Sequence, residues 1–176
     1  MTVATPPPVV REAGPSDAEA VGAALRDYLV QTEIEKSERG AGRLSASGDL
    51  PAAYRREVEN PADALTGCRI LVAELDDTVV GVAVLKPRAA SAEIKRLWAS
   101  PGVRGRGVGS ALLDAAIAAA GAAPVTLTVW DWRAGVIGLY ESRGFVRVAS
   151  WDARPRLVCM RRDAAHSAPE TPSEDR

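Results

Sequence analysis

The sequence predicts one mixed α/β domain built on a mostly antiparallel sheet. Its apolar residues recur in some segments with the alternation of strands and in others with the spacing of amphipathic helices. Two β-rich segments across a tight turn at Asp76 and Asp77 predict an antiparallel hairpin, and a later strand, helix, strand run predicts one crossover. With 176 residues and 47% hydrophobic content, the chain suits a single core over 9–163. The proline-containing tails at 1–8 and 164–176 are expected to be poorly ordered.

Caps and turn residues divide the first half of the chain. Ser16 and Glu19 have the spacing of a capping box before an apolar helical stripe. The glycine- and serine-rich segment 37–49 predicts a loop, and Pro51 suits the first turn of the next helix. The expected elements are a strand at 9–14, helices at 15–36 and 50–60, and strands at 68–75, 78–87 and 91–100.

The second half contains an alanine-rich amphipathic helix. Leu112, Leu113 and Ala116 form an apolar stripe along it, and Gly121 ends it. A last helix ends at Gly144, and two strands follow it. The expected elements are a helix at about 110–120, a strand at 124–130, a helix at 134–144, and strands at 145–151 and 156–162.

Charge and residue usage exclude several kinds of partner. The 22 basic and 23 acidic residues leave no net charge that would attract nucleic acid or an anionic membrane. We find no signal-peptide pattern and no apolar run of membrane-spanning length. Cys68 and Cys159 lie in apolar runs, which favours buried reduced thiols, and the only histidine, His166, lies in the second tail. We expect a cytoplasmic protein with no metal site and no histidine-dependent triad.

Glycines at 105, 107 and 109 stand immediately before the alanine-rich helix. The start of a helix carries unpaired N–H groups and the positive end of the dipole, and glycine keeps side chains away from those amides. This pattern favours phosphate binding, with a tight turn and close packing as the alternative. The segment lacks the Lys-Ser/Thr pair of an NTPase P-loop, and an antiparallel hairpin precedes it, so nucleotide hydrolysis and dinucleotide binding are disfavoured.

The segment R-G-R-G-V-G-S-A-L-L after E-I-K-R-L-W-A-S-P, with L-Y-E-S-R-G-F some thirty residues later, resembles the GNAT superfamily of acyl-CoA-dependent N-acetyltransferases. Arg104, Gly107 and Gly109 occupy that family's Arg/Gln-x-x-Gly-x-Gly/Ala pattern. The resemblance extends over about 9–162. It implies helices on both faces of the sheet, splayed strands at 91–100 and 124–130, and acetyl transfer from acetyl-CoA to a primary amine by direct attack in a ternary complex.

The resemblance also implies which residues hold the cofactor. Amides of 104–110 would bind the pyrophosphate, and the backbone of 97–99 would pair with the pantetheine arm and polarise the thioester carbonyl. Arg133 replaces a family asparagine and could reach a phosphate instead, while Asp131 could cap the last helix. The implied cofactor residues are Leu97, Trp98, Ala99, Arg104, Gly105, Arg106, Gly107, Val108, Gly109, Ser110 and Arg133. Core packing is an equally compatible role for the Leu97 and Trp98 side chains.

Two catalytic residues follow from the same resemblance. An alkylamine has a pKa of about 10, like lysine, so it must lose a proton before it attacks. Glu93 stands where several family members place a glutamate base, although an ion pair with Lys95 or Arg96 is the alternative. Tyr140 matches the tyrosine that protonates the departing thiolate, with core packing as its alternative.

The acceptor is the least defined part of the prediction. Trp130 and Trp132 could line a pocket for an apolar or cationic amine, or could fill the core, and the loop 38–50 could cover that side as a lid. A small-molecule amine and a protein amine both stay open, as does pairing of two subunits through sheet edges. The alternatives to an acetyltransferase are a catalytically silent acyl-CoA sensor of the same fold, a nucleotide-binding module, and an enzyme for longer acyl chains.

Overall fold

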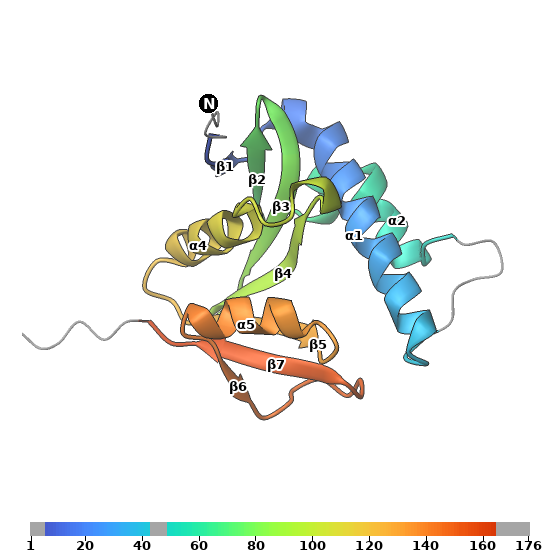
Figure 1. Ribbon diagram of the computed structural model, residues 1–176, viewed down its shortest axis with the longest axis vertical. Coiled ribbons are helices and arrows are strands. Elements are labelled where there is room, and N and C mark those ends of the chain that lie inside the picture. Colours follow the sequence, from blue (N-terminus) through green and yellow to red (C-terminus); the bar gives the residue numbers. More distant parts are fainter. Residues whose placement is uncertain (1–5, 43–48, 165–176) are drawn as a thin grey trace, which may run out of the picture.

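A seven-stranded sheet with the order β1-β2-β3-β4-β5-β7-β6 forms the centre of the molecule (Figure 1). The computed structural model describes residues 6–42 and 49–164. The strands are β1 Val9–Glu12, β2 Arg69–Leu75, β3 Thr78–Pro87, β4 Ala92–Ala99, β5 Val125–Trp130, β6 Val146–Val148 and β7 Leu157–Arg162. The helices are α1 Ala18–Glu38, α2 Ala52–Glu59, α3 Pro61–Ala64, α4 Val108–Ala120 and α5 Ala134–Ser142, with 3-10 turns η1 Pro15–Asp17 and η2 Pro101–Val103. Most of both predicted tails and the centre of the predicted lid lie outside the described residues.

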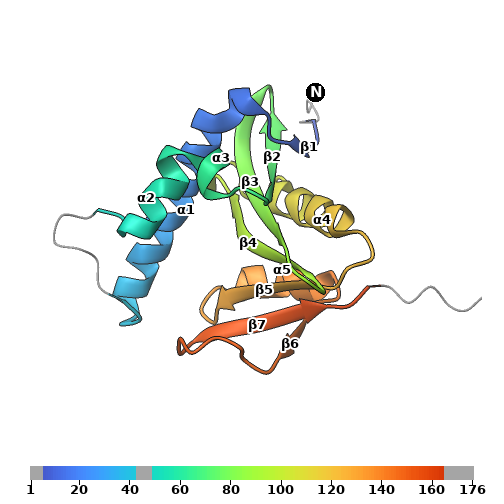
Figure 2. The same cartoon turned by 180° about the vertical axis from the view of Figure 1, so that it is seen from behind.

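The pairing of β4 with β5 is the one parallel step in a sheet that is otherwise antiparallel. It extends only from Ala92 opposite Val125 to Ile94 opposite Leu127, and beyond these pairs the two strands diverge. Figures 1 and 2 show the result from two sides, with β1–β4 in one half of the sheet and β5–β7 in the other. The predicted mixed α/β class and the splayed strands are therefore confirmed.

Helices cover both faces of the sheet, as the resemblance implies (Figures 1 and 2). The core between α1 and the sheet contains Val21 and Leu25 from the helix and Val72, Val82 and Val84 from the strands. The core beneath α4 and α5 contains Leu85, Ile94, Leu112, Leu113, Leu127, Ile137, Phe145 and Met160. In the described part of the chain, no helix combines the length and the apolar character needed to cross a bilayer.

Gly81 lets α4 pack directly on the first half of β3. A Cβ at this position would lie 2.8 Å from both the Leu112 Cδ1 atom and the Trp98 carbonyl oxygen. Gly81 is also paired with Ala99, the last residue of β4. This close approach therefore places the first turn of α4 beside the end of β4, where the glycine-rich turn begins.

The predicted Ser16/Glu19 capping box is wrong. The η1 turn comes first, and the Asp17 carboxylate accepts a hydrogen bond of 2.7 Å from the Gly14 amide. Arg11 on β1 holds the same carboxylate in an ion pair of 2.7 Å. An acidic residue one position further along the chain therefore ties the start of α1 to the edge of the sheet.

Candidate active site

A glycine-rich turn connects β4 to α4 and is open to solvent. Gly105 and Gly107 adopt φ angles of 79° and 78°, in the left-handed region that glycine enters without steric cost. A Cβ built on either residue would meet no atom within 4 Å. The turn therefore exposes its backbone on a surface without covering side chains.

Several amides of this turn have no acceptor in the protein. The amides without a hydrogen-bond acceptor among the described residues are those of Gly105, Gly107, Val108, Gly109 and Ser110. The amides of Arg104 and Arg106 are already bonded within the turn, at 3.3 and 3.2 Å, so the free set is narrower than the predicted 104–110. Free donors at the positive end of a 13-residue helix suit an anion, and the residues present fit the diphosphate of an acyl-CoA.

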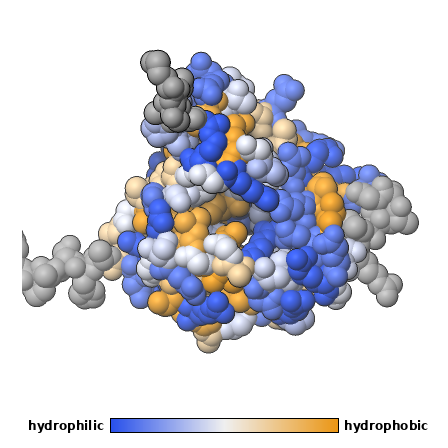
Figure 3. All heavy atoms as spheres, in the orientation of Figure 1, coloured by the Kyte–Doolittle hydropathy of each residue, from blue (hydrophilic) through white to orange (hydrophobic). Residues whose placement is uncertain are grey.

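A groove of about 890 Å³ starts at this turn and continues between β4, α5 and α1. Figure 3 shows this face hollowed at its centre, with hydrophobic residues toward α4 and hydrophilic residues toward α1. The predicted cofactor residues that line the groove are Leu97, Trp98, Ala99, Arg104, Gly105, Gly107, Val108, Gly109, Ser110 and Arg133. Arg106 is the predicted cofactor residue that is not part of this lining.

The edge of β4 that faces β5 has no strand partner along most of this groove. β3 pairs with β4 as far as Ala99, but β5 leaves β4 after Ile94. Residues 97–99 therefore keep one backbone edge available to an extended ligand, which could add to the sheet as a further strand.

A second, smaller pocket of about 110 Å³ lies where β4 and β5 separate. Tyr28, Leu97, Arg133 and Val136 line both this pocket and the groove. The two spaces therefore meet at these four residues. A ligand extended along the groove would reach the mouth of the smaller pocket there.

Tyr140 lies in α5 and lines the smaller pocket. It is only 5% exposed, and its ring packs against Phe145 with the centroids 5.7 Å apart. Burial, together with nearby Tyr28, raises the pKa of Tyr140 well above its ordinary value, and Arg133 offsets this only in part. The hydroxyl is therefore protonated at neutral pH.

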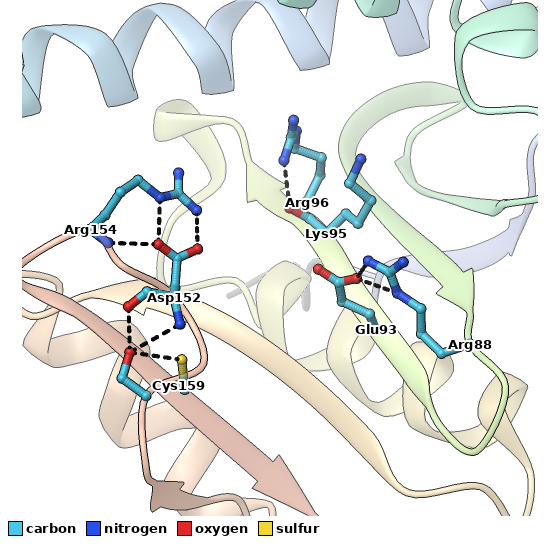
Figure 4. A network of polar contacts seen from close by, with 8 residues as sticks. Arg88, Glu93, Lys95, Arg96, Asp152, Arg154 and Cys159 are labelled. Atoms are coloured by element: carbon cyan, nitrogen blue, oxygen red, sulfur yellow. Dashed lines mark hydrogen bonds and ion pairs between the residues drawn. The ribbon is translucent and has the colours of Figure 1, made fainter.

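Glu93 lies apart from both spaces. It does not belong to the lining of the groove or of the smaller pocket. Its carboxylate accepts a hydrogen bond of 2.8 Å from the Arg88 Nε atom and a second, shorter one from the same guanidinium (Figure 4). A register shift beside Lys95 interrupts the regular alternation of β4, and the ion pair of Glu93 with Lys95 or Arg96, the alternative to a catalytic role, does not form.

Arg133 joins the start of α5 to α1. Its Nε atom donates to the Glu35 carboxylate at 2.8 Å, and its Nη2 atom donates to the Thr32 hydroxyl at 2.9 Å. The predicted cap of α5 is wrong, because Asp131 pairs with Arg156 at 3.1 Å and the helix has no side-chain cap.

Glu35 is the shared acceptor at this junction. Burial disfavours its charge, but hydrogen bonds from Trp132, Gln31 and Arg133 lower the pKa of Glu35 below its ordinary value. The carboxylate therefore stays ionised and holds Trp132 at 2.9 Å as one wall of the groove.

Trp130 and Trp132 stand at the end of β5, and the protein's own arginines cover their rings. Arg154 lies 5.9 Å from the centre of the Trp130 ring, while Arg39 and Arg156 lie 5.3 and 5.0 Å from that of Trp132. Trp130 lines the smaller pocket and Trp132 lines the groove, and a cationic acceptor would compete with these guanidinium groups for the ring faces.

Sequence patterns did not reveal several pocket residues. Tyr28, Tyr54, Arg96 and Arg154 line the smaller pocket, and each comes from a different segment of the chain. No local motif connects them, since only the fold brings them together. Within the described ranges, no group of three or more His, Cys, Asp or Glu residues could hold a metal ion.

Comparison with known proteins agrees with this geometry. The sequence model of the acetyltransferase (GNAT) family matches residues 32–145, which is more than half of the chain. No curated protein sequence matches the chain significantly. Solved structures with a similar fold include the PaiA N-acetyltransferase of Thermoplasma acidophilum in complex with coenzyme A, with a TM-score of 0.66 and 20% identity over 89% of this chain and 98% of that one.

Two further structures show the same fold. One is described as histone acetyltransferase HPA2 and related acetyltransferase from Corynebacterium glutamicum, with a TM-score of 0.62 and 22% identity over 94% of this chain and 100% of that one. Another is the ribosomal-protein-alanine N-acetyltransferase of Brucella melitensis, with a TM-score of 0.63 and 22% identity over 88% and 99%. The chain belongs to the GNAT acetyltransferase family.

Proposed function

We propose that this protein transfers an acetyl group from acetyl-CoA to a primary amine by direct attack in a ternary complex. The observation that supports this proposal is that the groove and the smaller pocket join. A groove that starts at unbonded amides joins a small pocket lined by the buried, protonated Tyr140. One space suits a long anionic cofactor, and the other suits a small acceptor.

Acetyl-CoA, when bound, supplies an activated thioester. The free amides from Gly105 to Ser110 would bind its diphosphate, and the open edge of β4 at 97–99 would hold the extended arm. An amide near Ala99 would stabilise negative charge on the carbonyl oxygen during attack. Neither Cys68 nor Cys159 lines the groove or the pocket, which supports transfer without an acyl-cysteine.

In the transfer step, the amine nitrogen forms a bond to the acetyl carbon, and the C–S bond breaks with its electron pair on sulfur. Tyr140 gives its hydroxyl proton to the sulfur and regains one from the acetylated amine through solvent. Lys95, Arg96 and Arg154 line the pocket, and Glu57 and Asp152 pair with the two arginines. The charge of Lys95, which has no carboxylate partner among the described residues, disfavours the protonated form of a bound amine. The proposed deprotonation therefore relies on the pocket as a whole and not on Glu93.

Release of free CoA over a panel of amines tests the proposed function. At least one class of amine should raise CoA release well above the hydrolysis measured without amine. If none does, while CoA still raises the melting temperature, the acyl-CoA sensor is favoured. A larger stabilisation by ATP or NAD than by CoA would favour a nucleotide-binding module.

We also propose a cytoplasmic location, supported by the free state of both cysteines.

A further inference from the structure

The smaller pocket is lined by more cations than anions. The cationic side chains are Lys36, Lys95, Arg96, Arg133 and Arg154, and the carboxylate is Glu33. Lys36 engages both Glu33 oxygens, at 2.8 and 3.1 Å. Carboxylates outside the lining pair with three of the other cations, Glu57 with Arg96, Glu35 with Arg133 and Asp152 with Arg154. The pocket therefore offers an acceptor the positive charge of Lys95 and several hydrogen-bond donors.

Arg96 is the most enclosed of these cations that keeps an unused donor. Its guanidinium lies 5.8 Å from the centre of the Tyr28 ring and 5.7 Å from that of Tyr54. One terminal nitrogen donates to Glu57 at 3.1 Å, and the other donates to the Lys95 carbonyl at 2.9 Å. Its Nε atom is buried and has no partner in the part of the chain that the structure describes, and the same holds for the Oε2 atom of its partner Glu57. A buried N–H without an acceptor is costly, so this donor favours a ligand that supplies one.

Arg154 reaches the same space from the segment before β7. Asp152 accepts from its Nε atom at 2.9 Å and from its Nη2 atom at 2.7 Å, and no acceptor for Nη1 is found among the described residues. Figure 4 shows Arg154 on one side of the gap and Lys95 and Arg96 on the other. The Lys95 ammonium likewise has no partner in the described ranges. Arg96 from β4 and Arg154 from the segment before β7 therefore line one small pocket, and each keeps a donor without an acceptor among the described residues.

Given the acetyl transfer proposed above, on which this inference rests, we infer that the acceptor is a small amine that also carries a carboxylate. The carboxylate binds between Arg96 and Arg154, beside the hydroxyls of Tyr28 and Tyr54, and the amine lies toward Tyr140. A carboxylate accepts several hydrogen bonds at once and offsets the positive charge that would repel an amine alone. The pocket volume of about 110 Å³ suits an acceptor of this size better than a protein chain.

Matched acceptors test this inference directly. α-Amino acids are compared with their own carboxamides, with rates referred to the concentration of free amine because the two amines differ in pKa. The carboxylate should raise kcat/KM by about tenfold or more. In Arg96→Gln and Arg154→Gln the preference should fall to within about twofold. Arg147→Gln is the control, because Arg147 is 59% exposed on β6 and pairs with Glu141 outside the pocket; it should keep the preference.

Further measurements separate the possible failures. If Arg96→Gln does not fold, Arg154→Gln decides, since that side chain is 55% exposed. Equal rates for carboxylate and carboxamide in the wild type would overturn the inference, and so would a preference for aminoalkyl phosphates. Calorimetric titration of CoA-saturated protein provides a readout without turnover. Suppose that the protein binds carboxylates selectively, that Arg154→Gln abolishes this binding, and that no amine is acetylated. The anion site would then be supported, and the proposed acetyl transfer would be refuted.

Discussion

Trp130 and Trp132 stack with ring centroids 4.7 Å apart and planes 10° from parallel, although they line different spaces. Trp130 lines the smaller pocket, and Trp132 lines the groove. Arginines lie against both rings, and Glu35 fixes the Trp132 indole through a hydrogen bond of 2.9 Å. The pair therefore forms a rigid wall at the end of β5, between the proposed cofactor and acceptor sites.

Tyr140→Phe should lower kcat by about 100-fold, because it removes the proposed proton donor. The dissociation constant for CoA and the melting temperature should change little, since phenylalanine fills the same buried volume. Burial raises the pKa of Tyr140, so the wild-type hydroxyl should stay protonated and kcat should not decline between pH 8 and about 10 on its account. Steady-state kinetics over this pH range check both statements. A kcat within about threefold of wild type would leave Tyr140 a packing role only.

Glu93→Gln should change kcat/KM by less than about threefold, because the carboxylate pairs with Arg88 away from both spaces. Arg88→Gln serves as the matched variant and should have an equally small effect. Initial rates with a good acceptor provide the measurement. A loss of about 100-fold in Glu93→Gln alone would restore Glu93 as the general base.

Gly107→Ala should weaken CoA binding by about tenfold or more, since a methyl group would enter the open side of the turn at φ 78°. The strained backbone should also lower the free energy of unfolding by about 1–2 kcal/mol. Gly102→Ala is the control, because a Cβ there also meets no atom within 4 Å and its φ is not positive. Titration calorimetry with CoA compares the variants, and equal affinities would contradict the proposed phosphate site.

Gly81→Ala should lower the free energy of unfolding by about 1–3 kcal/mol, because the new methyl group would press on the Leu112 side chain and the Trp98 backbone. Gly138→Ala provides the opposite case. It is an exposed position in α5 with open space around it, and the change should raise stability by up to about 1 kcal/mol. Denaturant melts of the two variants should therefore move in opposite directions.

Asp17 predicts an acid-sensitive contribution to stability. The hydrogen bond from Arg11, with that from the Gly14 amide, lowers the pKa of Asp17 from 3.8 to about 2. A carboxylate with a lowered folded-state pKa stabilises the fold above pH 4, and this stabilisation is lost as the pH falls toward 2. The difference in melting temperature between wild type and Asp17→Asn should shrink over that interval.

Much of the fold could be predicted from local pattern. The hairpin turn at Asp76 and Asp77 is present with both residues at positive φ, and the glycine turn leads into α4 as expected. Both features depend on backbone conformations that few residue types adopt, so the sequence marks them clearly. The capping box failed because the η1 turn at Pro15–Asp17 precedes α1, and Asp17, held by Arg11 of the preceding strand and by the Gly14 amide, stands at the start of the helix instead of Ser16.

The acceptor pocket could not be predicted in the same way. Arg96 and Arg154 lie 58 positions apart and meet only because β4 and β5 diverge. The placement of Glu93 depended on a register shift beside Lys95, which strand alternation does not reveal. Residues that the fold brings together from distant parts of the chain leave no pattern in the local sequence. The anion-binding character of the pocket could therefore be inferred only from the three-dimensional structure.

The short parallel pairing between β4 and β5 opens the groove, and it also weakens the connection between the two halves of the sheet. With pairing limited to Ala92–Ile94 against Val125–Leu127, the two half-sheets depend on the helices to keep them in register. An acetyl-CoA molecule bound in the groove would contact β4 on one side and α5 on the other, and would therefore connect the two half-sheets. Binding of acetyl-CoA is therefore expected to reduce the relative motion of the two half-sheets.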